Sequence, residues 1–266
     1  STQGVSSAAS DVYKRQHIGS DFHYTIGFNF SHARNEILSM DEPSIKTDYR
    51  KREGHPINQY FGLICDGYVT QADLDSGNLP DSRFSSDVKV GDLKYRDMNQ
   101  DGFIDDRDET FIGYSDIPEN MYALNLSANY KNWGFSVMFQ GVDHVSRYYD
   151  AEAMFAFING GKVKEHHLER WNPAESEAYN LAHAKYPLLH YNDYGDHNQR
   201  QNSYFLKNGA FLRLKNIELS YTLPERWSHK VGMSDCRLYI NANNLVTWDH
   251  LDGLTDPESN LSLIHI

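Results

Sequence analysis

Apolar and polar residues alternate with a period of two in several stretches of the chain. The alternation is clearest in residues 122–130 (YALNLSANY), and it resumes after a turn at Lys131–Gly134 in residues 135–140 (FSVMFQ). Because successive side chains of a β-strand point to opposite faces, this pattern predicts a β-hairpin with one apolar and one polar face.

The hairpin agrees with two kinds of β-structure. Each arm has about the length of a membrane-spanning strand, ~9–11 residues, and aromatic residues stand near the strand ends, as they do at the interfaces of outer-membrane barrels. A soluble β-sandwich with one solvent-exposed face on each sheet would produce the same alternation. The hairpin alone therefore leaves a membrane barrel and a soluble sandwich open.

Three further stretches are predicted to be strands. Phe22–Ser31 and Asp235–Leu245 alternate as the hairpin does. Ser203–Leu223 changes its apolar phase after Leu214, which predicts a β-bulge near Lys215–Asn216 that keeps the apolar side chains on one face.

Short connections between the strands alternate with very long ones. Outer-membrane barrels have short periplasmic turns and long extracellular loops. By that logic Lys131–Gly134 and Pro224–Ser234 are periplasmic turns, whereas the loop around Asp97 and the insertion Arg147–Gln201 are external.

The insertion is predicted to contain two short helices, at Ala151–Ile158 and Lys164–Trp171, the second ending before Asn172-Pro173. Residues 71–92, rich in Asp, Ser and Gly, are predicted to be loop. The insertion has five histidines, which would suit a metal site or a solvated loop: His166, His167, His183, His190 and His197. Only the adjacent pair is close in sequence and no acidic partner repeats, which favours solvated histidines.

An acidic turn before the hairpin has the spacing of a calcium-binding loop. Oxygen ligands stand at positions one, three, five, nine and twelve, glycine at position six allows the sharp turn, and position seven offers a backbone carbonyl. The candidate metal ligands are Asp97, Asn99, Asp101, the Phe103 carbonyl, Asp105 and Asp108. No helices flank the loop, and Asp replaces the usual Glu at position twelve. One structural calcium ion and a solvated turn held by side-chain-to-backbone hydrogen bonds both stay open.

The two ends of the chain look like translated sequencing adapter. Asp11–Gln16 (DVYKRQ) and Leu261–Ile266 (LSLIHI) can be encoded by one short DNA read in opposite orientations. Such segments are set aside in fold reasoning, as tags are. Residues 1–16 and 261–266 are therefore expected to be adapter, and residues 17–260 a biological segment that is open at both ends.

Composition narrows the class of protein. The formal net charge of −12 argues against nucleic acid as a partner, since nucleic-acid binding requires basic patches. No stretch reaches ~18 apolar residues, so no transmembrane helix is expected. Cys65 and Cys236 have neither metal-site nor redox spacing. A β-barrel stays open, because only alternate residues of its strands face lipid.

Seven short sequence motifs occur in an order that is more specific than any single motif. They are GHPINQYFG at 54–62, GDLKYRDMNQDGFID at 91–105, LNLSA at 124–128, FQG at 139–141, RWNP at 170–173, FLRLKNIELSYTLP at 211–224 and LYINANNL at 238–245. In their residues and in their order these motifs resemble the C-terminal barrel region of SusC/RagA-like TonB-dependent transporters of Bacteroidota. The resemblance covers nearly all of residues 17–260.

The resemblance implies an all-β fold, a partial antiparallel transmembrane β-barrel with long extracellular loops, cut from a plugged barrel of about 22 strands. It implies an outer-membrane location and import of glycans, peptides or other large nutrients. The implied partners are a SusD-like lipoprotein lid, TonB, and outer-membrane lipid. The plug, the TonB-interacting segment and the closing strands are expected to lie outside the chain, so it should not transport alone.

The apolar face of the predicted strands is expected to meet lipid in the intact parent protein. The residues that share this phase are Phe22, Tyr24, Ile26, Phe28, Leu124, Leu126, Val137, Phe139, Leu238 and Ile240.

An enzyme is not expected. The sequence has no Gly-rich phosphate loop, no Gly-x-Ser-x-Gly and no His-Glu-x-x-His. The competing class is a secreted, calcium-stabilised β-sandwich that binds carbohydrate. A plug-like domain and further alternating strands encoded upstream would favour the transporter, whereas a complete small domain bounded by linkers would favour the sandwich.

Overall fold

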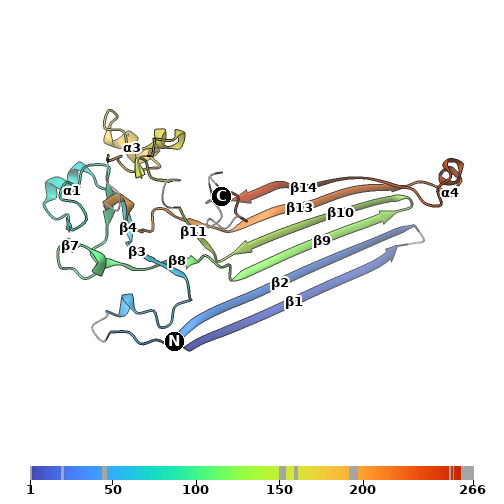
Figure 1. Ribbon diagram of the computed structural model, residues 1–266, viewed down its shortest axis with the longest axis horizontal. Helices are drawn as coiled ribbons and strands as arrows, with labels where there is room; N and C mark the ends of the chain where they lie inside the picture. The colour runs from blue at the N-terminus through green and yellow to red at the C-terminus, as the bar shows by residue number, and fades with distance from the viewer. Residues whose placement is uncertain are drawn as a thin grey trace.

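The chain folds into a long antiparallel sheet with an irregular region of loops at one end of it (Figure 1). The computed structural model describes residues 2–18, 21–43, 47–149, 154–158, 161–191, 197–251, 253 and 255–258. Residues 261–266, predicted to be adapter, and residues 151–153 of a predicted helix lie outside the described residues. We use the name loop region for the long segments that connect the strands of the sheet at the left of Figure 1.

The sheet has six strands in the order β1-β2-β9-β10-β13-β14, and every neighbouring pair is antiparallel. The strands are β1 (Thr2–Ile18), β2 (Phe22–Ser39), β9 (Asn120–Tyr130), β10 (Trp133–Asp143), β13 (Phe211–Thr222) and β14 (Arg237–Asp249). The predicted strands are confirmed with changed bounds. Strand β2 extends eight residues beyond the predicted Ser31 to Ser39, and the stretch predicted as one strand at Ser203–Leu223 is divided into a short strand at Leu206–Asn208 and β13.

The strand register places the predicted apolar residues on one face. Directly paired residues of antiparallel strands point to the same side, and Ile26 pairs with Leu126, which pairs with Val137 on its other side. The next row toward the turns joins Tyr24, Ala128, Phe135, Leu219 and Ile240. The expectation that the ten listed residues share a face is therefore confirmed.

A register shift in β13 supplies the predicted β-bulge. Pairing with β14 slips between Leu214 and Asn216, and pairing with β10 slips at the facing step between Met138 and Phe139. The extra residue is Lys215. It lets Leu214 and Ile217 stay on the same apolar face, as the change of phase in the sequence requires.

The apolar face is not covered by a second layer in the described structure. Large side chains along it stay exposed, with exposed fractions of 40% for Ile26, 47% for Leu219 and 78% for Ile240. A sheet with an apolar side normally packs against another element, so this face requires an apolar partner outside the described chain.

The loop region consists of short elements. Its strands pair as β3 (Gln59–Gly62) with β8 (Thr110–Ser115), β4 (Cys65–Tyr68) with β6 (Leu93–Tyr95), β5 (Asp81–Ser82) with β7 (Phe103–Ile104), and β11 (Ser146–Tyr148) with β12 (Leu206–Asn208). Its helices are α1 (Gln71–Ser76) and α3 (Glu177–His183), with 3-10 turns η1 (Asp48–Arg50), η2 (Asp106–Asp108), η4 (Glu165–Glu169) and η5 (His197–Gln199). At the opposite end of the sheet, α4 (Glu225–Ser228) and η6 (His229–Val231) join β13 to β14.

The helix predictions were partly wrong. The helix predicted at Lys164–Trp171 is only the 3-10 turn η4, and α1 and α3 were missed. Helix α1 lies inside residues 71–92, which were predicted to be loop. Thr70 caps the first turn of α1 and Gly77 ends the helix. Because residue types that cap helices are also common in loops, this short stretch has the composition of a loop. No helix among the described residues is long and apolar enough to span a membrane.

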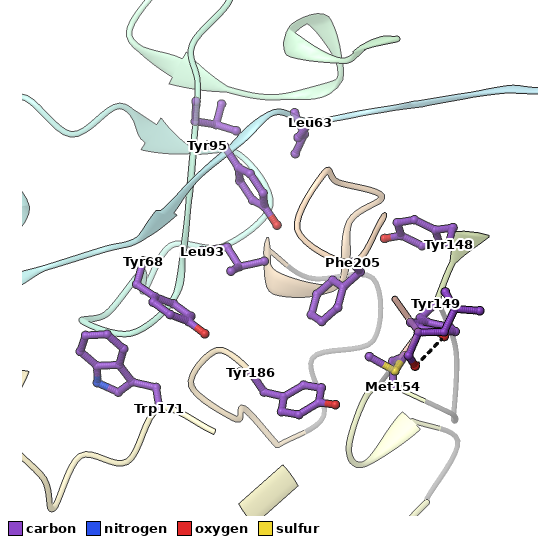
Figure 2. Close-up of a cluster of buried hydrophobic side chains, with 12 residues drawn as sticks. Leu63, Tyr68, Leu93, Tyr95, Tyr148, Tyr149, Met154, Trp171, Tyr186 and Phe205 are labelled. Carbon is purple, nitrogen blue, oxygen red and sulfur yellow. Dashed lines mark hydrogen bonds between the residues drawn. The ribbon is translucent and has the colours of Figure 1, made fainter. Parts of the chain in front are cut away.

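The hydrophobic core lies in the loop region. Leu63, Leu93, Tyr149, Phe205 and Leu251 are at most 1% exposed. Figure 2 shows the first four of them gathered with further aromatic side chains, and the cluster is built from segments that are far apart in sequence. The loops are therefore a packed unit with their own core, although the connections that form them are long.

Strand β1 includes residues 2–16, which were predicted to be adapter, and it pairs with β2 along its whole length. Its side chains do not continue the two-faced pattern, because Lys14 pairs with Ile26 and Gln16 with Tyr24 on the apolar face. A lysine at the centre of a lipid-facing surface costs about 2–4 kcal/mol. This departure supports the adapter assignment, which stays a prediction.

The close packing of Gly91 gives a test of the loop core. Gly91 has φ +95°, and a Cβ there would lie 2.4 Å from the ring of the buried Trp171. Gly77 also has positive φ, +65°, with no atom within 4 Å of a Cβ. We expect Gly77→Ala to cost about 1–2 kcal/mol from backbone strain alone, and Gly91→Ala about 1–3 kcal/mol more from the clash.

Hydrogen exchange of the backbone amides around Leu93 would measure this difference. Equal protection factors in the Gly91 and Gly77 variants would contradict the packing of Trp171 against Gly91.

Candidate functional site

The face of the sheet opposite the apolar one is polar. One row across it joins Thr25, Ser127, Ser136, Glu218 and Asn241. The sheet therefore separates an apolar surface from a hydrophilic one, as a wall between lipid and an aqueous interior does.

A cluster of charges holds the segment after β14 against the polar face. The guanidinium of Arg213, on a side chain only 4% exposed, donates to Asp256 at 2.6 Å and to Glu258 at 2.9 Å. Lys215 adds an ion pair with Glu258 at 2.7 Å. A buried arginine needs such partners, because an unpaired buried charge is strongly destabilising. The cluster thus fixes residues 255–258 near the loop-region end of the sheet.

The six predicted calcium ligands lie in one tight turn, but the five side chains among them accept hydrogen bonds from the protein. Asp97 accepts from the backbone N–H of Gln100 (2.6 Å) and of Gly102 (2.8 Å). The side chain of Asn99 accepts from the N–H of Asp101 at 3.0 Å, and Asp101 in turn accepts from the N–H of Phe103 at 3.0 Å. These are the side-chain-to-backbone bonds of an Asx turn.

Arg107 neutralises two of the predicted ligands. Its guanidinium lies 2.7 Å from a carboxylate oxygen of Asp101 and 2.7 Å from one of Asp105. The hydrogen bond from Arg107 is the main reason that the pKa of Asp105 is lowered from its usual value. The sequence pattern did not include this arginine, which is an internal cation for the acidic turn.

Asp108, the predicted twelfth ligand, is a buried staple. It is fully buried and accepts from three backbone N–H groups: those of Met98 (2.9 Å), Asn99 (3.4 Å) and Asp105 (2.9 Å). Burial raises the pKa of its carboxyl although these bonds favour the ionised form. Asp108 therefore closes the turn by joining its first residues to the start of η2.

Among the described residues, which include the whole turn, no group of three or more His, Cys, Asp or Glu side chains is arranged to hold a metal ion. The oxygens are the ligand type that calcium prefers, but the carboxylates are turned to N–H donors. This is the geometry of the hydrogen-bonded turn. Calcium binding would require several carboxylates to exchange these donors for the ion, and it stays a prediction.

The interpretation of the insertion histidines as solvated was wrong for two of them. His167 is 1% exposed, donates from Nε2 to the Met154 carbonyl (2.7 Å) and accepts at Nδ1 from the Lys164 N–H (3.0 Å). His197 is 5% exposed, and its Nε2 donates to the Leu93 carbonyl at 2.6 Å. Both histidines are structural donors: His167 closes its own segment, and His197 joins two distant segments, roles that sequence spacing does not reveal.

A buried aspartate network organises the same core. Asp92, 2% exposed, lies 2.6 Å from Nε2 of His190 and accepts from the Asn198 side chain at 2.8 Å and from the Lys89 N–H at 2.8 Å. Asn198 also accepts from the Leu93 N–H at 2.8 Å. The network was missed because its members come from segments about one hundred residues apart.

His166 leaves one nitrogen unsatisfied. Its Nε2 is buried without a hydrogen-bond partner among the described residues, and burial lowers the pKa of the imidazole, so the neutral form is favoured. An unpaired buried polar group costs about 1–3 kcal/mol. His166 lines a cavity of about 310 Å³ beside the loop core.

No protein-family model matches the chain. The chain is 25% identical over 266 residues to the TonB-dependent receptor P3 of Formosa agariphila, an alignment that covers 94% of this chain and 24% of the relative. It is 23% identical over 240 residues to the TonB-dependent receptor SusC of Bacteroides thetaiotaomicron, covering 90% of this chain and 22% of SusC. The chain thus spans about a quarter of the length of these relatives.

The fold is that of solved RagAB structures. The chain superposes on the RagAB peptide importer in the "open-open" state with a TM-score of 0.68 at 19% identity, over 97% of this chain and 26% of that chain. It superposes on the structure of the RagAB peptide transporter with a TM-score of 0.66 at 19% identity, over 96% of this chain and 27% of that chain.

The chain forms an open two-faced antiparallel sheet with a looped end, and its fold matches a part of the RagAB structures, so the predicted all-β antiparallel fold class is confirmed. The resemblance to SusC/RagA-like TonB-dependent transporters is also confirmed by the curated relatives, SusC among them. The six strands form an open wall and not a closed barrel.

The staple role of Asp108 can be tested by truncation. Asp108→Ala removes the acceptor of three backbone N–H groups, and we expect it to destabilise the turn by about 1–3 kcal/mol. Asp106→Ala removes a neighbouring carboxylate that is 69% exposed and should cost less than about 1 kcal/mol. Limited proteolysis of residues 97–108 would compare the two, and equal cleavage rates would contradict the staple.

Proposed function

We propose that the chain is part of an outer-membrane, TonB-dependent importer of a large nutrient, a glycan or a peptide. The observation that carries the proposal is the single-layer sheet, whose apolar and polar rows stay in register across β2, β9, β10, β13 and β14. Such a wall suits the boundary between lipid and an aqueous lumen. Similarity to SusC and to RagAB supports the transport class.

The loop region is proposed to face the outside of the cell and to meet the substrate and a SusD-like lipoprotein lid. All of the long connections gather at one end of the sheet, whereas the turns Lys131–Asn132 and residues 223–236 lie at the other (Figure 1). The packed core gives these loops a fixed surface. TonB would act on the parent protein through segments outside this chain, and nucleic acid is not a proposed partner.

A secreted, calcium-stabilised sandwich is not favoured. A sandwich buries the inner face of one sheet against a second sheet about 10 Å away. The described residues supply no such layer over the apolar rows, and Leu219 and Ile240 stay exposed. The relatives are receptors and transporters, which agrees with a protein that performs no chemical reaction.

A charge on the apolar face tests its contact with lipid. Leu126 lies between Ile26 and Val137 near the middle of the apolar rows. In the complete parent protein, we expect Leu126→Arg to cost about 2–4 kcal/mol of folding free energy in a bilayer. Urea titration of the barrel folded into lipid vesicles would measure the cost.

The neighbouring Asn125 is the matched control, because it pairs with Gly27 and Met138 on the polar face. Asn125→Arg should cost much less than Leu126→Arg. Equal tolerance of arginine at both positions would show that the apolar rows do not face lipid.

A structural calcium ion in the acidic turn is proposed as a secondary property of the external loop. It would be held by Asp97, Asn99, Asp101, the Phe103 carbonyl, Asp105 and Asp108, with Arg107 displaced from Asp101 and Asp105. The ion would perform no chemistry and would fix the turn. Because these donors must be exchanged, we expect weak binding, with a Kd on the order of 10⁻⁴–10⁻³ M.

Calorimetry with calcium on the complete parent protein would test this proposal. Asp101→Ala should abolish binding and Asp106→Ala should not, while Arg107→Gln should strengthen binding by removing the competing cation. Absence of binding at millimolar calcium, or equal loss in the two alanine variants, would leave only the hydrogen-bonded turn.

A further inference from the structure

A cavity of about 550 Å³ lies between the end of α1, the short ladder of β5 and β7, and residues 85–88. Ligand pockets typically enclose about 300–1,000 Å³, so this one has room for a small ligand group. Both α1 and β7 lie at the end of the loop region that is farthest from the sheet (Figure 1). The six-stranded sheet contributes none of the lining residues.

One face of the ladder forms a wall of the cavity. Asp81 pairs directly with Phe103, and the Arg83 N–H donates to the Ile104 carbonyl at 2.9 Å. Since side chains two residues apart share a face of a strand, Asp81, Arg83 and Phe103 point to the same side. All three line the cavity, whereas Ile104 on the opposite face is only 2% exposed. The ladder therefore holds an anion, a cation and an aromatic ring at one wall.

The guanidinium of Arg83 is held on the ring but is not paired with a protein acceptor. Its central carbon lies 3.6 Å from the centroid of Phe103, a cation–π contact that orients the planar group. The side chain is exposed, and its guanidinium has neither a hydrogen bond nor an ion pair among the described residues. Its charge acts on Asp105, but that carboxylate is already bonded to Arg107 at 2.7 Å. The N–H donors of Arg83 are thus open to a ligand.

The remaining polar lining suits the hydroxyl groups of a ligand. Asp81 is exposed, and its carboxylate accepts no hydrogen bond and forms no ion pair within the described part of the chain. The hydroxyl of Ser85 accepts from the Asp87 N–H at 3.2 Å and can still donate, and Ser86 adds a second, exposed hydroxyl. Carboxylates accept hydrogen bonds, and serine hydroxyls both accept and donate them. The cavity therefore offers an anion-binding fork beside several partners for hydroxyls.

We propose that this cavity binds an acidic saccharide unit, such as a uronate. Its carboxylate accepts two parallel hydrogen bonds from Arg83, a bidentate pairing that the planar guanidinium favours. Its hydroxyls donate to Asp81 and exchange hydrogen bonds with Ser85 and Ser86. This assignment rests on the proposed function for its biological role, because it names one class of nutrient that the external loops recognise.

Calorimetry on the complete parent protein in detergent tests the proposal, with digalacturonate as the probe and its methyl ester as the uncharged match. The buffer contains EDTA, so that calcium cannot bridge the probe to the acidic turn. We expect saturable binding of the acid and about tenfold weaker binding of the ester, as for the loss of one charge-assisted contact. Absence of acid binding, or equal affinity for the two probes, would overturn the proposal.

Variants at Arg83 locate the contact. Arg83→Met keeps an unbranched chain on Phe103 and removes the fork, so binding of the acid should weaken about tenfold, while the affinity for the ester and the Tm stay unchanged. Arg83→Lys keeps the charge without the bidentate geometry and should weaken binding of the acid by a smaller factor.

Arg226→Met is the matched control. Arg226 also lies over an aromatic ring, 5.8 Å from the centroid of Trp227, but in α4 at the opposite end of the sheet. Its replacement should leave the affinity for digalacturonate unchanged. Equal losses in Arg83→Met and Arg226→Met would contradict the assignment.

Triglutamate separates a saccharide site from a general carboxylate site. It carries carboxylates without sugar hydroxyls, so we expect it to bind about tenfold more weakly than digalacturonate. Triglutamate binding that is equally tight, and that Arg83→Met abolishes, would show that the site recognises carboxylates alone and would overturn the saccharide assignment. A parent protein that imports nutrient but binds neither digalacturonate nor its ester would disprove this inference and leave the proposed function intact.

Discussion

The constraint on which the rest of the structure depends is an apolar sheet face that the protein does not cover. Rows such as Ile26, Leu126 and Val137 are continuous across neighbouring strands, and the large side chains along them stay partly exposed. In water this surface would favour association or collapse, whereas in a bilayer it is the stable arrangement, because all backbone groups between strands are paired. The bulge at Lys215 follows from the same constraint, since without it Ile217 and Leu219 would turn to the polar face. Strand pairing supplies order within the sheet, and in the proposed function lipid would supply the missing layer.

Because the sheet buries little apolar surface within the chain, the loop region needs a core of its own. That core explains why several of the sequence motifs together indicate the fold although they lie far apart in the chain. Gly91 of GDLKYRD lies against Trp171 of RWNP, where any side chain larger than hydrogen would clash. A Cβ on Gly62, the last residue of GHPINQYFG, would lie 2.3 Å from the Gln201 carbonyl oxygen. Arg213, in the motif that forms β13, is held by Asp256 and Glu258. These three motifs thus include contact points between segments that are far apart in the chain.

The sheet could be predicted from the sequence because its signal is local. Alternation along residues 122–140 specifies strand, turn and face within one hairpin, and a phase change is enough to place the bulge. The loop region could not be predicted in this way. Helix α1 is only six residues long and is defined by its caps, Thr70 and Gly77. His167 and His197 are buried through contacts with Met154 and Leu93. Burial of a polar side chain is decided by its tertiary partners, which no periodicity encodes.

The acidic turn and His166 differ in how far the protein satisfies their polar groups. In the turn, Asp97, Asp101 and Asp108 obtain N–H donors from their own backbone, and Arg107 neutralises the cluster. An ion must therefore compete with bonds that already exist. His166 is the contrasting case, because its buried Nε2 has no hydrogen-bond partner among the described residues. Spacing in the sequence pointed to the turn as a metal site, but spacing alone does not show that the protein already satisfies the oxygens of the turn.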